Sequence, residues 1–131
     1  ACRAKGHGCT LGDISDLDDP DDTVDLVWCR HAIEHSPYPL FTLYEFNRVL
    51  RLGGGLYVEV PAPALPRAHE FNPNHYSILG PHMWVALMQR SGFEVFETRE
   101  IRLELQQGDQ KVPELFYAFM AKKCRSIASA N

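Results

Sequence analysis

Residues 12–61 read GDISDLDDPDDTVDLVWCRHAIEHSPYPLFTLYEFNRVLRLGGGLYVEVP, and the order of patterns in this stretch decides the fold. An acidic loop leads into the apolar run 24–29, which is typical of a strand buried on both faces. Apolar residues then recur at spacings of about three and four, which predicts an amphipathic helix that ends at the glycines beginning with Gly53. Residues 56–63 predict the next strand. This order of strand, helix and strand indicates a parallel α/β unit.

The flanking segments predict further elements: the end of a helix at 1–5, a strand at 9–14, a helix at 81–91, strands at 93–105 and 115–123, and a frayed tail at 125–131. The last two strands are separated only by a short polar segment, so they are expected to pair as a hairpin. We therefore expect a single α/β domain over residues 1–131, with a mainly parallel sheet that ends in an antiparallel hairpin.

Composition excludes several classes of function. The net charge is -4, whereas nucleic-acid binding usually needs a clustered basic face, so we expect no nucleic-acid partner. No apolar run approaches the roughly 18 residues of a membrane-spanning helix. The four cysteines form no CxxC pair and the N-terminus lacks a signal-peptide pattern, which favours a reducing, cytoplasmic location.

The segment HAIEH at 31–35 matches HxxEH, a zinc-protease pattern. That pattern requires both histidines on one helix, but a predicted strand precedes His31, and Pro37 and Pro39 follow His35. We therefore predict no metal site, and a zinc hydrolase built on His31 and His35 stays an alternative function. The segment should instead follow a parallel strand at its carboxyl end, where open α/β sheets bind ligands.

Several short segments occur in a characteristic order: GD, VDLV, EH, E..RVLRLGGG and VEVP within residues 12–61, followed by MWVALMQRSGFEV at 83–95. With these segments the chain resembles the second half of a class I S-adenosylmethionine-dependent methyltransferase. The resemblance implies a Rossmann-like sheet with strand order 3-2-1-4-5-7-6. It also implies S-adenosylmethionine as cofactor and methyl transfer to a small-molecule or other acceptor.

The resemblance implies cofactor contacts at particular positions, namely Asp13, Ile14, Cys29, Arg30, His31 and His35. Asp13 matches the acidic residue that accepts a hydrogen bond from the adenine amino group, and Ile14 matches its neighbour at the ring. Residues 29–31 match the segment beneath the methionine part of the cofactor. Two alternatives stay open, because Asp13 could only cap a turn and His35 could only pack against the helix start.

The polar loop at 66–84 follows the strand edge from which this family builds its acceptor pocket. His75 and Tyr76 in this loop are candidate catalytic residues, because an imidazole titrates near neutral pH and can act as a base. Asparagine and proline are also ordinary loop residues, so a purely structural loop is the alternative.

The chain departs from the family pattern at its N-terminus. It has no glycine-rich loop after a first strand, and we expect a domain truncated before strand three. The absent strands would lie between strands three and four, so residues 24–29 would expose an apolar edge. We expect strand three to pair there, or two chains to associate as a homodimer. A truncated, non-catalytic association module is therefore an alternative function.

Overall fold

The computed structural model describes residues 3–127, so the expectations for residues 1–2 and 128–131 lie outside the described residues. Its main elements, in chain order, are β1 (Val24–Arg30), α1 (Pro39–Val49), β2 (Leu50–Pro61), α2 (Pro81–Arg90), β3 (Phe93–Gln107) and β4 (Gln110–Lys123). Short 3-10 turns occur at Arg3–Lys5, Ile33–His35 and His69–Phe71. No helix within residues 3–127 is long and apolar enough to cross a membrane.

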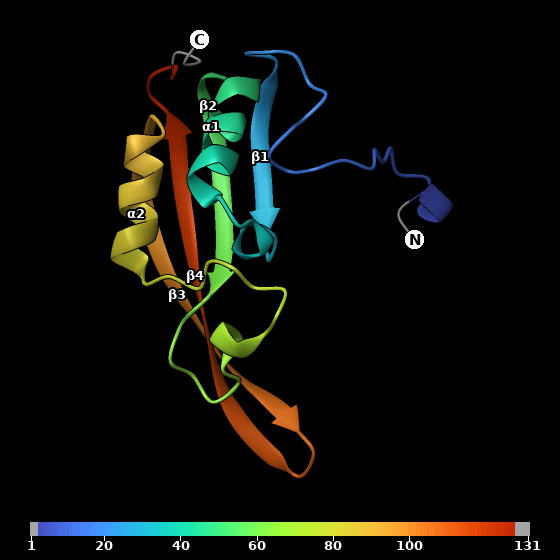
Figure 1. Cartoon of the computed structure of the whole chain (residues 1–131), viewed down its shortest axis with the longest axis vertical. Helices are drawn as coiled ribbons and strands as arrows, with labels where there is room; N and C mark the ends of the chain where they lie inside the picture. Colours follow the sequence, from blue (N-terminus) through green and yellow to red (C-terminus); the bar gives the residue numbers. More distant parts are fainter. Residues whose placement is uncertain (1–2, 128–131) are drawn as a thin grey trace.

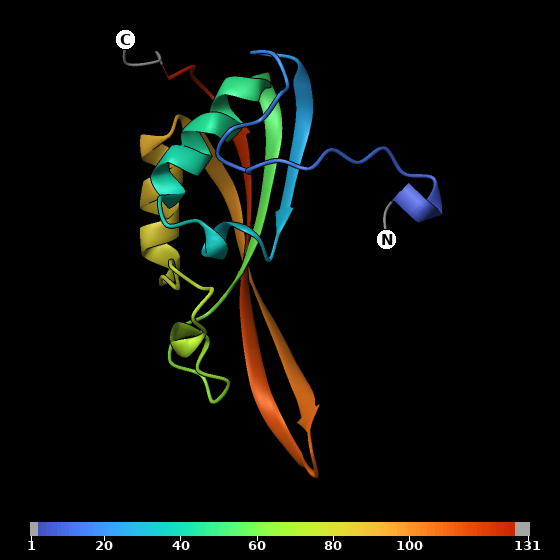
Figure 2. The same cartoon turned by 45° about the vertical axis from the view of Figure 1, so that its right-hand side comes forward.

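The strands form one sheet in the order β1-β2-β4-β3. β1 and β2 are parallel, while β4 is antiparallel to both β2 and β3. This order matches the last four strands in the expected order 3-2-1-4-5-7-6, which confirms the Rossmann-like fold with its terminal hairpin. Both helices cover the same face of the sheet (Figures 1 and 2).

The hydrophobic core lies between this sheet face and the two helices. α1 contributes Leu43, α2 contributes Trp84 and Met88, and the sheet contributes Val58 and Phe119, all of them fully buried. The predicted helical periodicities are thus confirmed, because the apolar stripe of each helix faces the strands.

The sequence predicted that α1 ends at the glycines beginning with Gly53, and this prediction is wrong. The helix ends at Val49 and β2 starts at once with Leu50, whose carbonyl oxygen accepts a hydrogen bond from Lys123 Nζ at 2.7 Å. Gly54 is part of β2, and a Cβ there would meet Arg51 O at 2.8 Å. Close packing within the strand therefore explains this glycine.

The predicted strand at 9–14 does not form. This segment is exposed apart from Ile14, makes only an isolated bridge between Asp13 and Asp16, and leads to an N-terminal segment that extends away from the sheet (Figure 2). A single strand gains stability only from a partner, and none of the described residues lies beside this segment in a ladder. The prediction that strand three pairs with the exposed edge is therefore wrong.

β1 consequently pairs only with β2 among residues 3–127. Leu26 is 55% exposed and Trp28 is 63% exposed, so the prediction of a strand buried on both faces is also wrong. Cys29 faces the helices and is buried. Trp28 stacks on Tyr57 of β2, with ring centroids 3.9 Å apart, on the sheet face that the helices leave uncovered.

Arg48 of α1 holds the acidic loop that precedes β1. Its guanidinium donates to the carbonyl oxygens of Leu17 and Asp19 at 2.9 Å, and to Asp21 Oδ1 at 2.7 Å. It also contacts both carboxylate oxygens of Glu45 one helical turn away. The loop is thus anchored to α1 from several sides.

Candidate functional site

The candidate site lies where β1 ends. His31, directly after the strand, has a left-handed backbone conformation with φ of 49°, which is uncommon for a residue other than glycine. Its N–H donates to Glu59 O at 2.9 Å, and the chain then turns into Ile33–His35. HAIEH thus forms a single 3-10 turn and no α-helix, as predicted. Such strain is often found at functional sites.

A cavity of about 700 Å³ opens at this end of β1. Its walls come from the loop after the N-terminal segment, from the turn after β1, and from the start of α1: Gly12, Asp13, Ile14, Ser15, His31, Ala32, His35, Ser36, Pro37, Tyr38 and Phe41. We call it the first cavity. It is large enough for part of a drug-sized ligand, and its walls combine apolar and polar groups as small-molecule sites do.

The first cavity brings together Asp13, Ile14, His31 and His35, which are among the residues that the resemblance selected. Cys29 does not line it, because its side chain is buried in the core, where desolvation raises the pKa of the thiol to about 11.

Arg30 does not line the first cavity either. Its guanidinium lies on the opposite side of the strand, and its Nε donates to Glu59 Oε1 at 2.9 Å. A side-chain contact from Cys29 or Arg30 to a ligand in the first cavity is therefore not supported.

A chain of hydroxyl groups holds the loop of Asp13 against α1. Ser15 Oγ lies 2.6 Å from Thr42 Oγ1, which in turn lies 2.7 Å from Ser36 Oγ. Asp13 Oδ1 accepts a hydrogen bond from Ser15 N at 2.8 Å. Asp13 therefore does cap a turn, as one of the two alternatives for this residue expected. The other carboxylate oxygen of Asp13 accepts no hydrogen bond from residues 3–127, so it is available to a ligand.

Glu59 is a functional candidate that the sequence analysis missed. Its buried carboxylate accepts hydrogen bonds from Tyr57 Oη at 2.6 Å and Arg30 Nε at 2.9 Å, and lies 2.9 Å from His31 Nε2. Burial alone would raise the pKa of Glu59, but the hydrogen bonds from Tyr57 and Arg30 outweigh it and hold the pKa below its usual range. The sequence offered one sign of this role, which is that Glu59 is a charged residue inside the otherwise apolar segment 56–61.

A second cavity of about 290 Å³ adjoins the first and shares His31 and His35 with it. Its other walls come from the turn after β1, the end of β2, the following loop and β4: Glu34, Pro61, Arg67, His69, Asn72, His75 and Phe116. We call it the second cavity.

The structure therefore brings the predicted catalytic candidate His75 to the site. Tyr76 lines neither cavity and is 65% exposed, and its backbone N–H donates to Glu34 O at 2.8 Å.

Comparison with known proteins gives two kinds of match. Residues 1–58, which end within β2, match the family model described as "Methyltransferase domain". A search among curated proteins found no significantly similar sequence.

Solved structures share the fold. The S-adenosylmethionine-dependent methyltransferase from Thermotoga maritima is 20% identical with a TM-score of 0.71, and the match covers 92% of this chain and 66% of that one. The corresponding enzyme from Archaeoglobus fulgidus is 17% identical with a TM-score of 0.66, covering 87% and 66%. The [4+2]-cyclase SpnF is 14% identical with a TM-score of 0.68, covering 87% and 54%.

The chain spans 54 to 76% of the length of the first structures that it matches. The family-model match includes the loop of Asp13 and the turn after β1, which form most of the first cavity. This match covers fewer than half of the residues, so it shows that the N-terminal part of the chain is similar to methyltransferase domains, while the solved methyltransferases show that the whole chain shares their fold.

Proposed function

We propose that this protein binds S-adenosylmethionine in the first cavity and transfers its methyl group to a small-molecule acceptor. The observation that carries the proposal is the convergence of Asp13, Ile14, His31 and His35 on one cavity at the carboxyl end of β1. Open α/β sheets bind their ligands at this edge. The cofactor supplies an activated methyl group on a sulfonium, so the protein has mainly to bind and align the reactants.

The adenine end fits the part of the first cavity near Asp13. The carboxylate oxygen of Asp13 that has no partner within residues 3–127 suits the exocyclic amino group, which is a hydrogen-bond donor. Ile14 is half-buried against the core and offers an apolar surface to one face of a ring. Tyr38 and Phe41 line the same cavity and are more than 60% exposed, so aromatic stacking is available too.

The second cavity suits the methyl acceptor because it shares His31 and His35 with the first. An acceptor there would lie next to the reactive end of a cofactor bound in the first cavity. Its size of about 290 Å³ favours a small molecule over a polymer. His75 is the candidate to receive a proton from the acceptor where the acceptor needs a base.

The fold alone does not determine the reaction. SpnF, described as a [4+2]-cyclase, matches with a TM-score of 0.68, close to the 0.71 of the Thermotoga methyltransferase. Similar sheets therefore support different chemistry, and the proposal depends on the residues of the first cavity.

Calorimetric titration of the purified protein with S-adenosylmethionine tests the proposal, and Asp13→Asn provides a specific variant. The asparagine oxygen can keep the hydrogen bond from Ser15 N, while its NH2 group would face the adenine amino group. We expect at least about tenfold weaker binding, because one hydrogen bond to a charged group is worth roughly 1.5 to 3 kcal/mol. Asp109→Asn, at the tip of the β3–β4 hairpin, is the matched control and should bind normally.

Absence of binding heat at millimolar cofactor would contradict the proposal and favour a non-catalytic association module. Equal affinities of the Asp13 and Asp109 variants would instead contradict the role of Asp13 at the adenine.

A further inference from the structure

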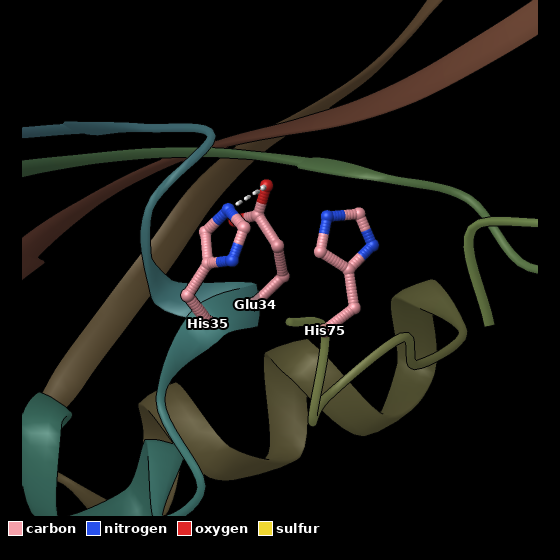
Figure 3. A group of neighbouring side chains, drawn as sticks. All are labelled: Glu34, His35 and His75. Carbon is pink, nitrogen blue, oxygen red and sulfur yellow. Dashed lines mark ion pairs between the residues drawn. The ribbon is translucent and has the colours of Figure 1, made fainter. Parts of the chain in front are cut away.

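We propose that Glu34, His35 and His75 form a binding site for a divalent transition-metal ion of the zinc type. One potential ligand atom from each residue lies within 4.8 Å of the other two. Glu34 and His35 come from the 3-10 turn after β1, whereas His75 comes from the loop between β2 and α2 (Figure 3). Two imidazoles and one carboxylate are a common ligand set for zinc.

Both histidines are held in the form that metal binding requires. His35 Nδ1 lies 2.8 Å from Asn74 O, and His75 Nδ1 lies 2.9 Å from His69 O. A carbonyl oxygen can only accept, so each Nδ1 carries a hydrogen and each neutral ring keeps a lone pair on Nε2. His75 Nε2 now accepts a hydrogen bond from Asn72 Nδ2 at 3.3 Å, and a bound ion would replace this long contact. Metal-binding histidines are usually oriented by such a bond from the other ring nitrogen.

Glu34 provides a second, independent observation. The residue is only 2% exposed, and its Oε2 is buried without a hydrogen-bond partner among residues 3–127. Its Oε1 lies 3.8 Å from His31 Nδ1 and 4.0 Å from His35 Nε2, which is beyond hydrogen-bond distance. A buried carboxylate without partners is costly unless a cation compensates it, and a divalent ion at this position would do so.

The geometry requires only a small adjustment. Ligands about 2.0 to 2.2 Å from a tetrahedral zinc ion lie roughly 3.3 Å from one another. The 4.0 Å between Glu34 Oε1 and His35 Nε2 would therefore close by less than about one ångström, and the distances to His75, which are at most 4.8 Å, by up to about 1.5 Å. The second cavity, which all three residues line, leaves room for a water or another ligand at the fourth position.

This site differs from the HxxEH pattern considered in the sequence. His31 is not one of the proposed ligands, because its Nε2 lies 2.9 Å from Glu59 Oε1. The second histidine ligand is His75, from a loop distant in the sequence. With an ion bound to its Nε2, His75 would hold the metal and would not act as the acceptor's base. Because His35 also lines the first cavity, the ion would lie between the proposed cofactor and acceptor positions. This placement relative to the cofactor rests on the proposed function, whereas the binding of the metal ion does not depend on it.

The test is a calorimetric titration of the chelator-treated protein with Zn²⁺ alone, without S-adenosylmethionine. We expect one ion per chain, and a pronounced weakening in Glu34→Gln, His35→Ala and His75→Ala. The loss of affinity should exceed the roughly tenfold to hundredfold that is lost when only the hydrogen-bond partner of a metal ligand is removed. His82→Ala, an exposed histidine of α2 that lines neither cavity, is the matched control and should bind normally.

Substitution with Co²⁺ gives a readout that does not depend on activity. A four-coordinate site gives the intense visible absorption of tetrahedral Co²⁺, which should disappear in Glu34→Gln, a variant that keeps the shape of the side chain. No stoichiometric Zn²⁺ binding, or equal binding in the His75 and His82 variants, would overturn the metal site. Because cofactor binding is titrated separately, failure of either proposal leaves the other measurable.

Discussion

His31 Nε2 and Glu59 Oε1 lie 2.9 Å apart, although His31 follows β1 and Glu59 belongs to β2. The parallel pairing of the two strands makes this contact, since Arg30 and Glu59 are partners in the register. The side chain of Glu59 is 5% exposed, yet it is shared among His31, Arg30 and Tyr57. Glu59 therefore connects His31, which lines the candidate site, to Arg30 and Tyr57 on the neighbouring parts of β1 and β2.

We predict that Glu59→Gln is destabilising by about 1 to 3 kcal/mol at neutral pH, because it removes a charged acceptor of several hydrogen bonds. The pKa of Glu59 is lowered in the folded state, so this contribution is present above the unfolded value near 4.5 and is lost as the pH falls through the folded pKa. Urea unfolding at about pH 7 and pH 3 measures it.

The difference between wild type and Glu59→Gln should therefore shrink in acid. Glu100→Gln, which changes an exposed glutamate of the hairpin, is the control and should change stability little at either pH. A difference that stays constant between the two pH values would contradict the role assigned to the Glu59 charge.

Arg48→Ala should destabilise the protein by about 1 to 3 kcal/mol, because it leaves the carbonyl oxygens of Leu17 and Asp19 without this donor and removes the ion pair with Glu45, which keeps only its hydrogen bond from Leu17 N. Urea unfolding gives the stability, and limited proteolysis within residues 16–22 reports release of the loop.

Arg51→Ala is the matched control. Arg51 lies near the start of β2, is 53% exposed and pairs with the exposed Asp25, so it should contribute between 0 and about 1 kcal/mol. If both arginine variants lose the same stability, the loop is not anchored through Arg48.

Cys29 should react with iodoacetamide much more slowly than Cys9. Burial raises the pKa of Cys29 from 9.0 to about 11, which lowers the thiolate fraction at neutral pH about a hundredfold, and the core also blocks access. Cys9 is exposed. Mass spectrometry of peptides after timed alkylation measures both rates in one sample, and equal rates would show that β1 opens readily.

The unpaired edge of β1 predicts self-association, because Leu26 and Trp28 are exposed on a strand that has a partner on one side only. We expect a homodimer in analytical ultracentrifugation. Leu26→Lys should weaken it by placing a charge at the edge, whereas Leu103→Lys, on the hairpin, should not. A stable monomer at the highest soluble concentration would contradict this prediction.

Local patterns predicted the helices and most strands well, because a helix or strand needs one apolar face and that face is visible in a short window. The spacing of Leu43 and Phe46 predicted the core face of α1, and Pro81 marked the start of α2. The boundary at Leu50 was missed, since the pairing with β1 extends β2 back to the helix. The strand at 9–14 was wrong because a local pattern cannot supply a neighbouring strand.

The candidate site was predictable only where the family resemblance reached it. The resemblance named Asp13, Ile14, His31 and His35, and the structure places them around one cavity. Glu59 was missed because its importance comes from contacts across the sheet, on a strand that reads as ordinary core.

By itself, the sequence determined the fold class, the order of the elements from β1 to β4 and the exclusion of a helical HxxEH site, because all of these depend on local periodicity and proline. Only the tertiary structure decided that β1 is an exposed edge and that His35 faces His75 across 40 residues of chain. Contacts between distant segments depend on loop conformation and strand pairing. Both are set by the packing of the whole chain and leave little trace in a short stretch of sequence.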